Sequence, residues 1–596
     1  MSIQTKKPEA AIVAVASIDQ MRGRLRKKTQ LKGRQPDHVS MNEVLALVGP
    51  GPHQRDLLIE HLHKLNDFYR GLHDRHLVAL SRQMNIPMAE IFEVATFYHH
   101  FEVLRDGQEA AALTVRVCDG LACEMRGAQE LLARLPALLG AAVRVIAAPC
   151  VGRCEQAPVV VVGQAPVVNA GAQQVQVAVA SGDVTHPVPA DDGEFDAAAT
   201  GPAPITTSPG EVSPAYVGLH GYRSRGGYQL AVRIQQGRLA PDEVVKALSD
   251  SGLRGLGGAG FPAGRKWGIV RQQPAPRLMA VNIDEGEPGT FKDRTYLERD
   301  PHRFLEGLLI AAQVVGTEAC YIYLRDEYHG CRAILERELE LLRADPPFPL
   351  PRIELRRGAG AYICGEESAM IESIEGKRGE PRMRPPYIAE VGLFGRPTLE
   401  HNFETLYWVR DIIERGAAWF SGFGRRDRKG LRSFSVSGRV KEPGVKLAPA
   451  GLSLRELVDE YCGGMLPGHE LYAYLPGGAS GGILPANMAH IPLDFDTLQP
   501  HGCFIGSAAV IVLSRHDKAR DAALNMMHFF EHESCGQCTP CRVGTGKAAK
   551  LMTAAKWDHE TLEDLNQVMV DASICGLGQA APNPIRCVQK YFPDEV

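Results

Sequence analysis

The stretch Gly255-Leu-Gly257-Gly258-Ala-Gly260-Phe261-Pro262-Ala-Gly264-Arg-Lys266-Trp267 is the most informative part of this 596-residue chain. It is dense in glycine, which lets backbone N–H groups approach a phosphate closely. A helix-like rather than a strand-like segment precedes it, so it departs from the usual dinucleotide-binding fingerprint. Taken alone, the stretch fits a tight turn and a phosphate-binding loop equally well.

Two later segments also join glycines to paired carboxylates. The predicted strand Met279–Ile283 runs into Asn282-Ile-Asp284-Glu285-Gly286-Glu287-Pro-Gly-Thr-Phe-Lys-Asp293, and a third segment reads Gly358-Ala-Gly-Ala-Tyr362-Ile-Cys-Gly365-Glu366-Glu367-Ser368. The sheets of α/β proteins bind ligands at the carboxyl ends of their strands. A solvated acidic turn would explain one such segment. Three in one region favour a flavin or nucleotide pocket.

Four cysteines near the C-terminus have the spacing of an iron–sulfur site. The run Glu533-Ser-Cys535-Gly-Gln-Cys538-Thr-Pro-Cys541-Arg is followed at a distance by Cys575. A C-x2-C-x2-C run with a remote fourth cysteine is typical of a [4Fe–4S] cluster. Zinc is a poor alternative, because three thiolates so close together crowd a tetrahedral ion. We predict a [4Fe–4S] cluster bound by Cys535, Cys538, Cys541 and Cys575.

A second set of four cysteines lies in the N-terminal third of the chain, in Cys118-Asp-Gly-Leu-Ala-Cys123 and Cys150-Val-Gly-Arg-Cys154. These gaps favour a [2Fe–2S] cluster over zinc, which usually prefers two-residue gaps, and over unrelated free thiols. A disulfide is unfavourable in a cytoplasmic chain. The other cysteines show no ligand spacing, and we expect most of them to be small buried hydrophobic residues: Cys320, Cys331, Cys364, Cys462, Cys503 and Cys587.

The composition excludes several classes of protein. Hydrophobic residues make up 44% and charged residues 23%, and 66 Lys+Arg against 70 Asp+Glu give a net charge of −4. These values are ordinary for a soluble globular protein, and a near-neutral charge argues against nucleic-acid binding. No apolar run reaches the ~18 residues of a membrane span. We therefore expect a cytoplasmic protein with no nucleic-acid and no membrane partner.

Periodicity and composition predict a multidomain α/β protein. Residues 1–39 form a basic N-terminal arm, either disordered or docked on an acidic partner subunit. Residues 40–184 form a helical bundle plus a thioredoxin-like half with a β-α-β-β order. Residues 185–216 are rich in proline and are predicted to be a linker that buries no core. Residues 217–432 form an α/β domain, residues 433–505 a strand-rich domain, and residues 506–596 a helical bundle.

These motifs resemble two subunits of respiratory complex I and their soluble relatives. Residues 217–596 resemble the NADH-binding flavoprotein subunit through Gly255–Trp267, Asn282–Asp293, Gly358–Ser368, Arg382–Tyr387, Asn402–Thr405 and the C-terminal cysteines. Residues 40–165 resemble the accompanying thioredoxin-like [2Fe–2S] subunit through Ala95-Thr-Phe-Tyr98 and their four cysteines. The resemblance implies a Rossmann-like FMN and NAD domain at 217–432, a β-grasp domain at 433–505 and a C-terminal four-helix bundle that holds the [4Fe–4S] cluster.

The resemblance also implies roles for individual residues. Phe261 and Tyr387 would stack on the NAD adenine, Glu287 would bind a ribose hydroxyl, and Arg384 would lie near the pyrophosphate. No residue is expected to act as a general acid or base, since hydride would pass directly between FMN and NAD, positioned by Glu287 and Glu367. The implied cofactor-binding set is Gly255, Gly257, Gly258, Phe261, Lys266, Asn282, Asp284, Glu285, Glu287, Tyr362, Gly365, Glu366, Glu367, Arg384, Tyr387, Asn402 and Thr405.

Two positions depart from the family pattern. The family often has Arg where Leu256 stands, and two consecutive Asn where this chain has His401-Asn402. Glu287 also has an alternative role, which is to cap the turn at Pro288-Gly289. If it binds ribose instead, its charge would repel the 2′-phosphate of NADP and make the protein specific for NAD.

Three segments, Gln54–His63, Leu253–Gly260 and Ser435–Pro449, look most like the fused β subunit of a molybdenum- or tungsten-dependent formate dehydrogenase. This implies a partner α subunit that carries a Mo or W pterin cofactor and iron–sulfur clusters, because no residue here looks like a molybdenum or nickel ligand. Electrons would travel through the [4Fe–4S] cluster to FMN and NAD, with the [2Fe–2S] cluster off this route. The alternatives are a diaphorase subunit of an NAD-reducing hydrogenase, a complex I fusion, and an assembly scaffold without redox activity.

Overall fold

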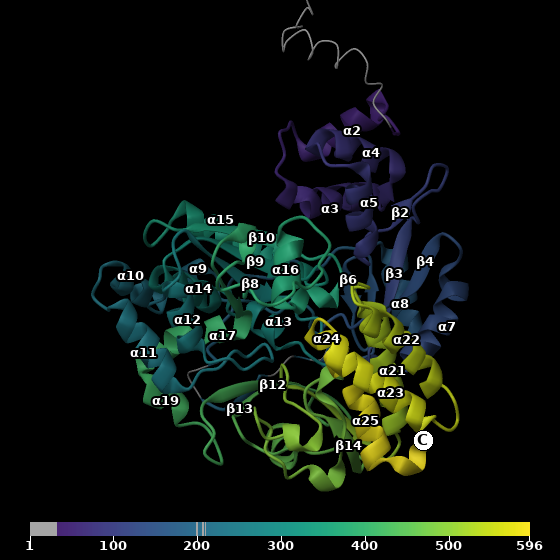
Figure 1. The fold of residues 1–596 in the computed structure, drawn as a ribbon, viewed down its shortest axis with the longest axis vertical. Coiled ribbons are helices and arrows are strands. Elements are labelled where there is room, and N and C mark those ends of the chain that lie inside the picture. Colours follow the sequence, from purple (N-terminus) through teal and green to yellow (C-terminus); the bar gives the residue numbers. More distant parts are fainter. Residues whose placement is uncertain (1–32, 198–200, 206–207, 209) are drawn as a thin grey trace, which may run out of the picture.

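The computed structural model describes residues 33–197, 201–205, 208 and 210–596 (Figure 1). Most of the predicted basic arm therefore lies outside the described residues. The first part is a helical bundle of α2 (His38–Val48), α3 (Leu58–Tyr69), α4 (Asp74–Met84) and α5 (Met88–Phe97). Asn85 ends α4 in a left-handed conformation with φ 54°, and Pro87 follows as the N-cap of α5. Two short parallel strands, β1 (Leu72–His73) and β2 (Val103–Leu104), flank the bundle.

The thioredoxin-like half follows the predicted β-α-β-β order. Its sheet has the order β4-β3-β5-β6, in which β3 and β4 run parallel and the other pairs antiparallel. Helices α7 and α8 pack beside it, and the short helix α6 holds one predicted ligand. The bounds are β3 (Leu113–Cys118), α6 (Leu121–Glu124), α7 (Ala128–Leu139), β4 (Val143–Ala148), β5 (Val160–Val162), β6 (Ala165–Val167) and α8 (Ala172–Ser181).

The third part is an α/β layer domain whose four parallel strands have the order β10-β9-β8-β11. The apolar run at the start of β8 suits a central parallel strand, which is covered on both faces. The strands are β8 (Arg277–Ile283), β9 (Thr317–Leu324), β10 (Arg352–Arg357) and β11 (Thr398–Asn402). The helices are α9 (Leu219–Ser224), α10 (Gln229–Gln235), α11 (Pro241–Ser251), α12 (Ala263–Arg271), α13 (Lys292–Leu297), α14 (Pro301–Val315), α15 (His329–Ala344), α16 (Glu367–Ile374), α17 (Phe403–Tyr407), α18 (Val409–Arg415) and α19 (Ala417–Ser421).

A mixed six-stranded sheet forms the fourth part and corrects two of our boundaries. Its order is β15-β14-β16-β12-β13-β7. Strand β7 comes from the segment 185–216, which we predicted to be a linker without a core; Ile205 and Tyr216 of that segment are buried, because the segment packs on neighbouring domains. Strand β16 comes from the predicted C-terminal helical region. The strands are β7 (Ala203–Ile205), β12 (Leu431–Gly438), β13 (Gly444–Pro449), β14 (Leu471–Leu475), β15 (Leu484–Pro485) and β16 (Ala509–Ser514).

The last part is a helical bundle that lies against the thioredoxin-like half (Figure 1). The Asn525 side-chain amide donates to the Asp119 carbonyl across this contact at 3.0 Å. The helices are α21 (Ala519–Glu533), α22 (Thr539–Met552), α23 (His559–Ala572), α24 (Gly576–Ala580) and α25 (Pro582–Tyr591). Within the described part of the chain, no helix is both long and apolar enough to cross a membrane.

Candidate functional site

An inner hollow of about 280 Å³ lies beyond the carboxyl ends of β8 and β11. The glycine-rich loop forms one wall and the Gly358–Ser368 segment another, so the three segments that the sequence singled out meet at one place. The six-stranded sheet and α24 close the remaining sides. The lining residues are Gly257, Gly258, Ala259, Asn282, Asp284, Glu285, Gly286, Glu287, Thr290, Lys292, Asp293, Tyr362, Ile363, Gly365, Glu366, Asn402, Ser480, Phe504, Gly506, Ser507, Gly576, Leu577 and Ala580.

The glycine-rich loop connects α11 to α12 and is closed at its neck. The Gly255 N–H donates to the Phe261 carbonyl at 2.8 Å, which holds the loop in a narrow turn. Gly258 has φ 127°, a conformation that side chains disfavour. A Cβ at Gly257 would lie 2.9 Å from the Asn402 Cβ. The loop therefore presents its bare backbone to the hollow, which is the surface a phosphate or ribityl group needs.

The polar side chains at the end of β8 differ in whether they have hydrogen-bond partners within the protein. The Asn282 side-chain amide donates to the Gly365 carbonyl at 2.8 Å and joins two walls. Asp284 is partly exposed as a residue, but its Oδ2 is buried without a hydrogen-bond partner among the described residues, and desolvation of the carboxylate raises its pKa well above the usual range. An orphaned buried oxygen beside a glycine cradle is what a bound polar cofactor would satisfy. The hollow therefore fits FMN.

Glu285 lines the hollow, but its carboxylate points to protein groups. It accepts hydrogen bonds from the N–H groups of Asp293 (2.8 Å) and Arg294 (3.1 Å) at the start of α13, and from the Tyr328 hydroxyl (2.8 Å). Burial raises the pKa of Glu285 to about 7, and the nearby Asp293 carboxylate adds to the rise. Its side chain thus fixes the chain direction after β8, and the cofactor contact that we expected of Glu285 stays a prediction.

Glu287 is also buried and engaged at both oxygens. One oxygen accepts from the Ser480 N–H (2.8 Å) and hydroxyl (2.6 Å), and the other accepts from the Tyr362 hydroxyl. These bonds differ from the turn cap at Pro288-Gly289 that we considered as an alternative. They also place Glu287 in the inner hollow, whereas the predicted adenine-stacking rings lie elsewhere. Its binding to ribose thus stays a prediction.

An outer hollow of about 770 Å³ adjoins the inner one and shares Gly257, Asn282, Gly365, Glu366 and Asn402 with it. Phe261 and Tyr387 line it and are 38% and 56% exposed, so both rings are open to a planar ligand. Arg384 lines the same hollow and is paired with Glu366 and, at 3.0 Å, with Glu367. Lys266 pairs with Glu400 at 2.6 Å in the same hollow. This is the shape expected for a dinucleotide.

All predicted cofactor-binding residues except Thr405 line one or both hollows. The Thr405 hydroxyl instead accepts the Leu256 N–H at 2.9 Å and anchors the glycine-rich loop from behind. At the other departure from the family pattern, His401 is buried and its Nε2 accepts the Trp267 indole N–H at 2.6 Å. Burial holds the pKa of His401 well below its usual value, which suits a neutral acceptor.

Sequence reasoning missed several lining residues. Lys292 is buried between Asp293 (2.6 Å) and Glu404 (3.1 Å) and supplies a fixed positive charge to the inner hollow. It belongs to the segment that we quoted, and a lysine among acids was a signal for it. Ser480 and Ser507 come from the strand-rich region, to which we assigned no chemistry, and no local pattern marks them.

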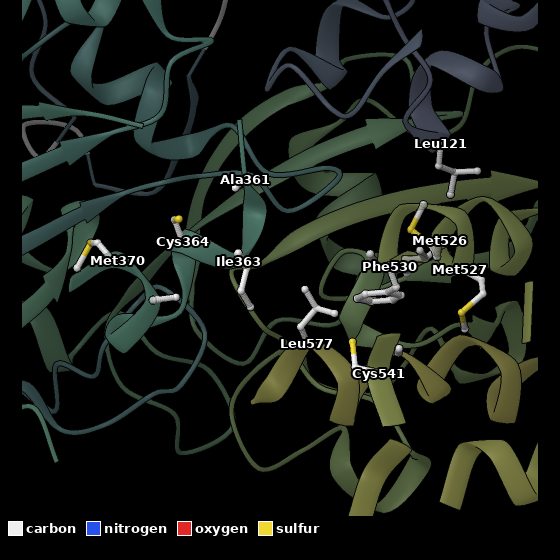
Figure 2. Close-up of a cluster of buried hydrophobic side chains, with 14 of the residues drawn as sticks. Leu121, Ala361, Ile363, Cys364, Met370, Met526, Met527, Phe530, Cys541 and Leu577 are labelled. Carbon is white, nitrogen blue, oxygen red and sulfur yellow. The ribbon is translucent and has the colours of Figure 1, made fainter. Parts of the chain in front are cut away.

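The C-terminal cysteines meet beside the inner hollow. Cys535 and Cys538 lie in the loop before α22, Cys541 in the first turn of α22, and Cys575 just before α24; all four line one small hollow. Four converging thiols match the donor set of a [4Fe–4S] cluster. Ile363 and Leu577 line both this hollow and the inner one. Figure 2 shows the two side chains side by side, with Cys541 next to Leu577.

The cysteines of the thioredoxin-like half meet in loops at one end of its sheet. Cys118 ends β3, Cys123 lies in α6, Cys150 follows β4 and Cys154 begins a short 3-10 helix; all four are buried. The Cys150 and Cys154 sulfurs are 3.2 Å apart. This donor set fits a [2Fe–2S] cluster. The six cysteines without ligand spacing are all buried, as expected.

Buried ionic contacts fix this second cysteine site to the flavin domain. Arg325 donates to the Cys150 carbonyl (2.7 Å) and to the Glu285 carbonyl (2.5 Å), so one guanidinium joins the cysteine loop to the rim of the inner hollow. Arg294 donates to the Gly152 carbonyl at 2.8 Å and also pairs with Glu155. Arg153 pairs with Glu298 at 2.8 Å.

Comparison with known proteins agrees with this geometry. Residues 248–411 match the Nuo51 FMN-binding domain, residues 521–596 the NADH-ubiquinone oxidoreductase-F iron–sulfur binding region, and residues 44–181 the thioredoxin-like [2Fe–2S] ferredoxin. One NADH-quinone oxidoreductase subunit of Rhizobium meliloti is 42% identical over 394 residues, which are 63% of this chain and 93% of that protein. The mitochondrial NADH dehydrogenase [ubiquinone] flavoprotein 1 of Dictyostelium discoideum is 41% identical over 374 residues, 60% of this chain and 78% of its own length.

A solved structure covers both halves at once. A chain of an NAD+-reducing [NiFe]-hydrogenase in the H2-reduced state aligns with a TM-score of 0.76 and 32% identity, over 91% of this chain and 92% of that one. The predicted cofactors FMN, NADH, [2Fe–2S] and [4Fe–4S] are thereby confirmed, as is the multidomain α/β fold with its thioredoxin-like part. The chain belongs to the family of NADH-oxidising flavoprotein subunits of NADH-quinone oxidoreductases, fused here to a thioredoxin-like [2Fe–2S] domain.

Proposed function

We propose that this chain is the NAD-reducing electron-transfer subunit of a cytoplasmic NAD-dependent formate dehydrogenase. The observation that carries the proposal is the set of four thioredoxin-half cysteines, complete in sequence and gathered at one buried site. Hydrogenase diaphorase subunits often lose some of these cysteines. The segments Gln54–His63, Leu253–Gly260 and Ser435–Pro449 add support, since they resemble the fused β subunit of formate dehydrogenases.

In this proposal the inner hollow binds FMN and the outer hollow binds NAD. FMN, when bound, exchanges hydride with NAD and single electrons with iron–sulfur clusters. The glycine-rich loop and Asn282 hold the inner ligand, while Phe261 and Tyr387 present aromatic faces to the outer one. Carboxylates on the shared wall, such as Glu366, favour the dinucleotide that lacks a 2′-phosphate.

Electrons from the partner subunit would reach the flavin through the C-terminal cysteines. Ile363 and Leu577 line both that site and the inner hollow, and Gly576, next to the predicted ligand Cys575, lines the inner hollow as well. On the other side, Cys535 and Cys538 are partly exposed. The position beside the inner hollow and the partial exposure of these cysteines support a role in electron transfer between the flavin and a partner. The partner would carry the Mo or W pterin cofactor and its own iron–sulfur clusters.

A second candidate is the diaphorase subunit of an NAD-reducing hydrogenase, favoured by the hydrogenase chain that aligns over both halves. The complex purified through a tag on this chain separates the two. Formate-dependent NAD+ reduction, with Mo or W in the large subunit, would support the proposal. Hydrogen-dependent NAD+ reduction with nickel would replace it.

The isolated chain provides a second test. We expect NADH oxidation with an artificial dye, ~6 iron atoms from the two clusters, and no formate oxidation. Formate oxidation by the chain alone would refute the assignment of the substrate site to another subunit.

A further inference from the structure

We propose that His99, His532 and Glu533 form a binding site for one divalent metal ion of the zinc type, separate from both cysteine sites. Their ligand atoms all lie within 4.8 Å of one another. His99 comes from the N-terminal bundle, and the other two residues end α21 of the C-terminal bundle. The site thus lies where two parts of the chain meet that are more than four hundred residues apart in sequence.

Backbone contacts hold the two sides of the site in place. His99 follows α5, and its N–H donates to the Gly360 carbonyl at 3.3 Å, next to the wall of the inner hollow. The His532 Nδ1 lies 3.1 Å from a Glu533 oxygen. The rings of His99 and His532 are 4.1 Å apart at an angle of 30°, so the two imidazoles lie face to face beside the Glu533 carboxylate.

The donor set is one that zinc accepts. Two histidines and a glutamate, with a fourth position open to water, are a known zinc arrangement. With zinc–ligand bonds of ~2.1 Å, tetrahedral neighbours lie ~3.4 Å apart, so the side chains must close in by ~1 Å. His99 and His532 are exposed and are free to rotate by that amount.

The surroundings supply room and a favourable field. A hollow of about 160 Å³ opens beside the three residues, which leaves space for a metal-bound water. The C-terminal end of α21 carries partial negative charge, which favours a cation there. Arg116 and Arg325 also line the hollow, but the charge of Arg325 is offset by its pairing with Glu327 at 2.7 Å.

The site is linked to the flavin hollow through one residue. The second Glu533 oxygen accepts the Tyr362 N–H at 2.9 Å, and the Tyr362 hydroxyl donates to Glu287. A metal that draws Glu533 toward the two histidines therefore acts on Tyr362, which lines the inner hollow. We infer that the bound ion slows electron exchange at the flavin.

Zinc added to the cluster-loaded full chain tests the proposal by calorimetry and X-ray absorption. We expect one zinc with nitrogen and oxygen ligands at ~2.0–2.1 Å. The affinity should fall by at least ~100-fold in His99→Ala and in His532→Ala. The control is His528→Ala, since His528 lies on the same helix beside Glu531 (3.4 Å) and should not matter.

Each result decides the matter. Zinc with sulfur ligands at ~2.3 Å, or an unchanged affinity in both histidine variants, would overturn the site. Slower NADH–dye turnover with zinc, seen in the native chain and absent in His99→Ala, would support the link to Tyr362. An unchanged rate with zinc bound through nitrogen and oxygen would overturn that link. None of these results depends on whether the partner oxidises formate or hydrogen.

Discussion

The two cysteine sites of this chain differ in how they meet solvent and in how they meet the flavin hollow. In the thioredoxin-like half all four cysteines are buried, and charged residues such as Arg325 and Arg294 form the contact with the flavin domain. In the C-terminal bundle three of the four are partly exposed, and the wall toward the inner hollow is the apolar pair Ile363 and Leu577.

This difference suggests different tasks. A cluster site that borders both the flavin hollow and the protein surface can exchange electrons with the flavin on one side and with a partner on the other. Neither exchange requires the surrounding chain to open. The four cysteines of the thioredoxin-like half are all buried, and their loops contact both the flavin domain and the C-terminal bundle, so this site has no such exposed face among the described residues. We therefore expect the C-terminal site to lie on the route between NADH and the partner and the thioredoxin-like site to lie off it.

The largest effect should come from Cys541→Ser. Loss of one [4Fe–4S] ligand should lower partner-dependent NAD+ reduction in the purified complex by at least ~100-fold. NADH–dye activity should persist, because the dye can take electrons at the flavin. Spectroscopy shows whether the cluster is lost, and assays of partner-dependent NAD+ reduction and of NADH–dye activity show whether the first falls while the second persists. Partner-dependent turnover near the native level would show that electrons reach the flavin by another route.

Arg294→Met tests the charged contact of the other site. Arg294 is 2% exposed, and its removal leaves Glu155 without its buried partner and Glu298 with Arg153 alone. Breaking such a pair costs ~3–5 kcal/mol. Hydrogen exchange of residues 150–156 should therefore speed up markedly. The control is Arg134→Met, an exposed pair with Glu130 worth ~0.5 kcal/mol or less. Equal protection of residues 150–156 from hydrogen exchange in both variants would contradict the view that buried ion pairs hold the cysteine loop on the flavin domain.

Gly257→Ala tests the loop between the two sites. Its new Cβ would lie 2.9 Å from the Asn402 Cβ, and overpacking of this kind costs ~1–3 kcal/mol. FMN should bind ~5- to 100-fold more weakly, as fluorescence titration of the free flavin would show. Gly255→Ala is the matched control, since its nearest neighbour would be the Phe261 carbonyl oxygen at 3.7 Å. A weaker FMN affinity in the control alone would contradict the loop geometry.

Glu287→Gln tests the choice of nucleotide. Loss of the charge should shift the NADH/NADPH preference by ~10- to 100-fold toward NADPH. Ser480→Ala keeps the charge but removes a hydroxyl that donates to Glu287 at 2.6 Å. Steady-state kinetics with both nucleotides compare the variants. The same shift of the NADH/NADPH preference in both variants would mean that the position of the Glu287 carboxylate matters rather than its charge. An unchanged preference in both would mean that Glu287 takes no part in nucleotide recognition.

Local patterns predicted the chemistry of this chain well. Cysteine spacing reports a donor set directly, since ligands close in sequence must be close in space, and both sets do converge. The glycine-rich loop, Asn282 and Gly365 were also predictable, because a strand end and a bare backbone are features of single segments.

Long-range packing could not be predicted in the same way. Ser480 and Leu577 reach the inner hollow only because the sheet and α24 fold against it. Strand β7 forms from a proline-rich segment because β13 offers it a free edge. Glu285 and Glu287 look alike in sequence, yet one caps α13 and the other holds Ser480, and only the tertiary structure separates those roles.

The most direct test of the two-site account is the turnover of the purified complex carrying Cys150→Ser. Loss of this ligand should abolish the [2Fe–2S] electron paramagnetic resonance signal, while the [4Fe–4S] signal and most of the partner-dependent NAD+ reduction stay. The account predicts this retained turnover beside the severe loss in Cys541→Ser. An equal loss of turnover in the two variants, with FMN still bound in both, would contradict it.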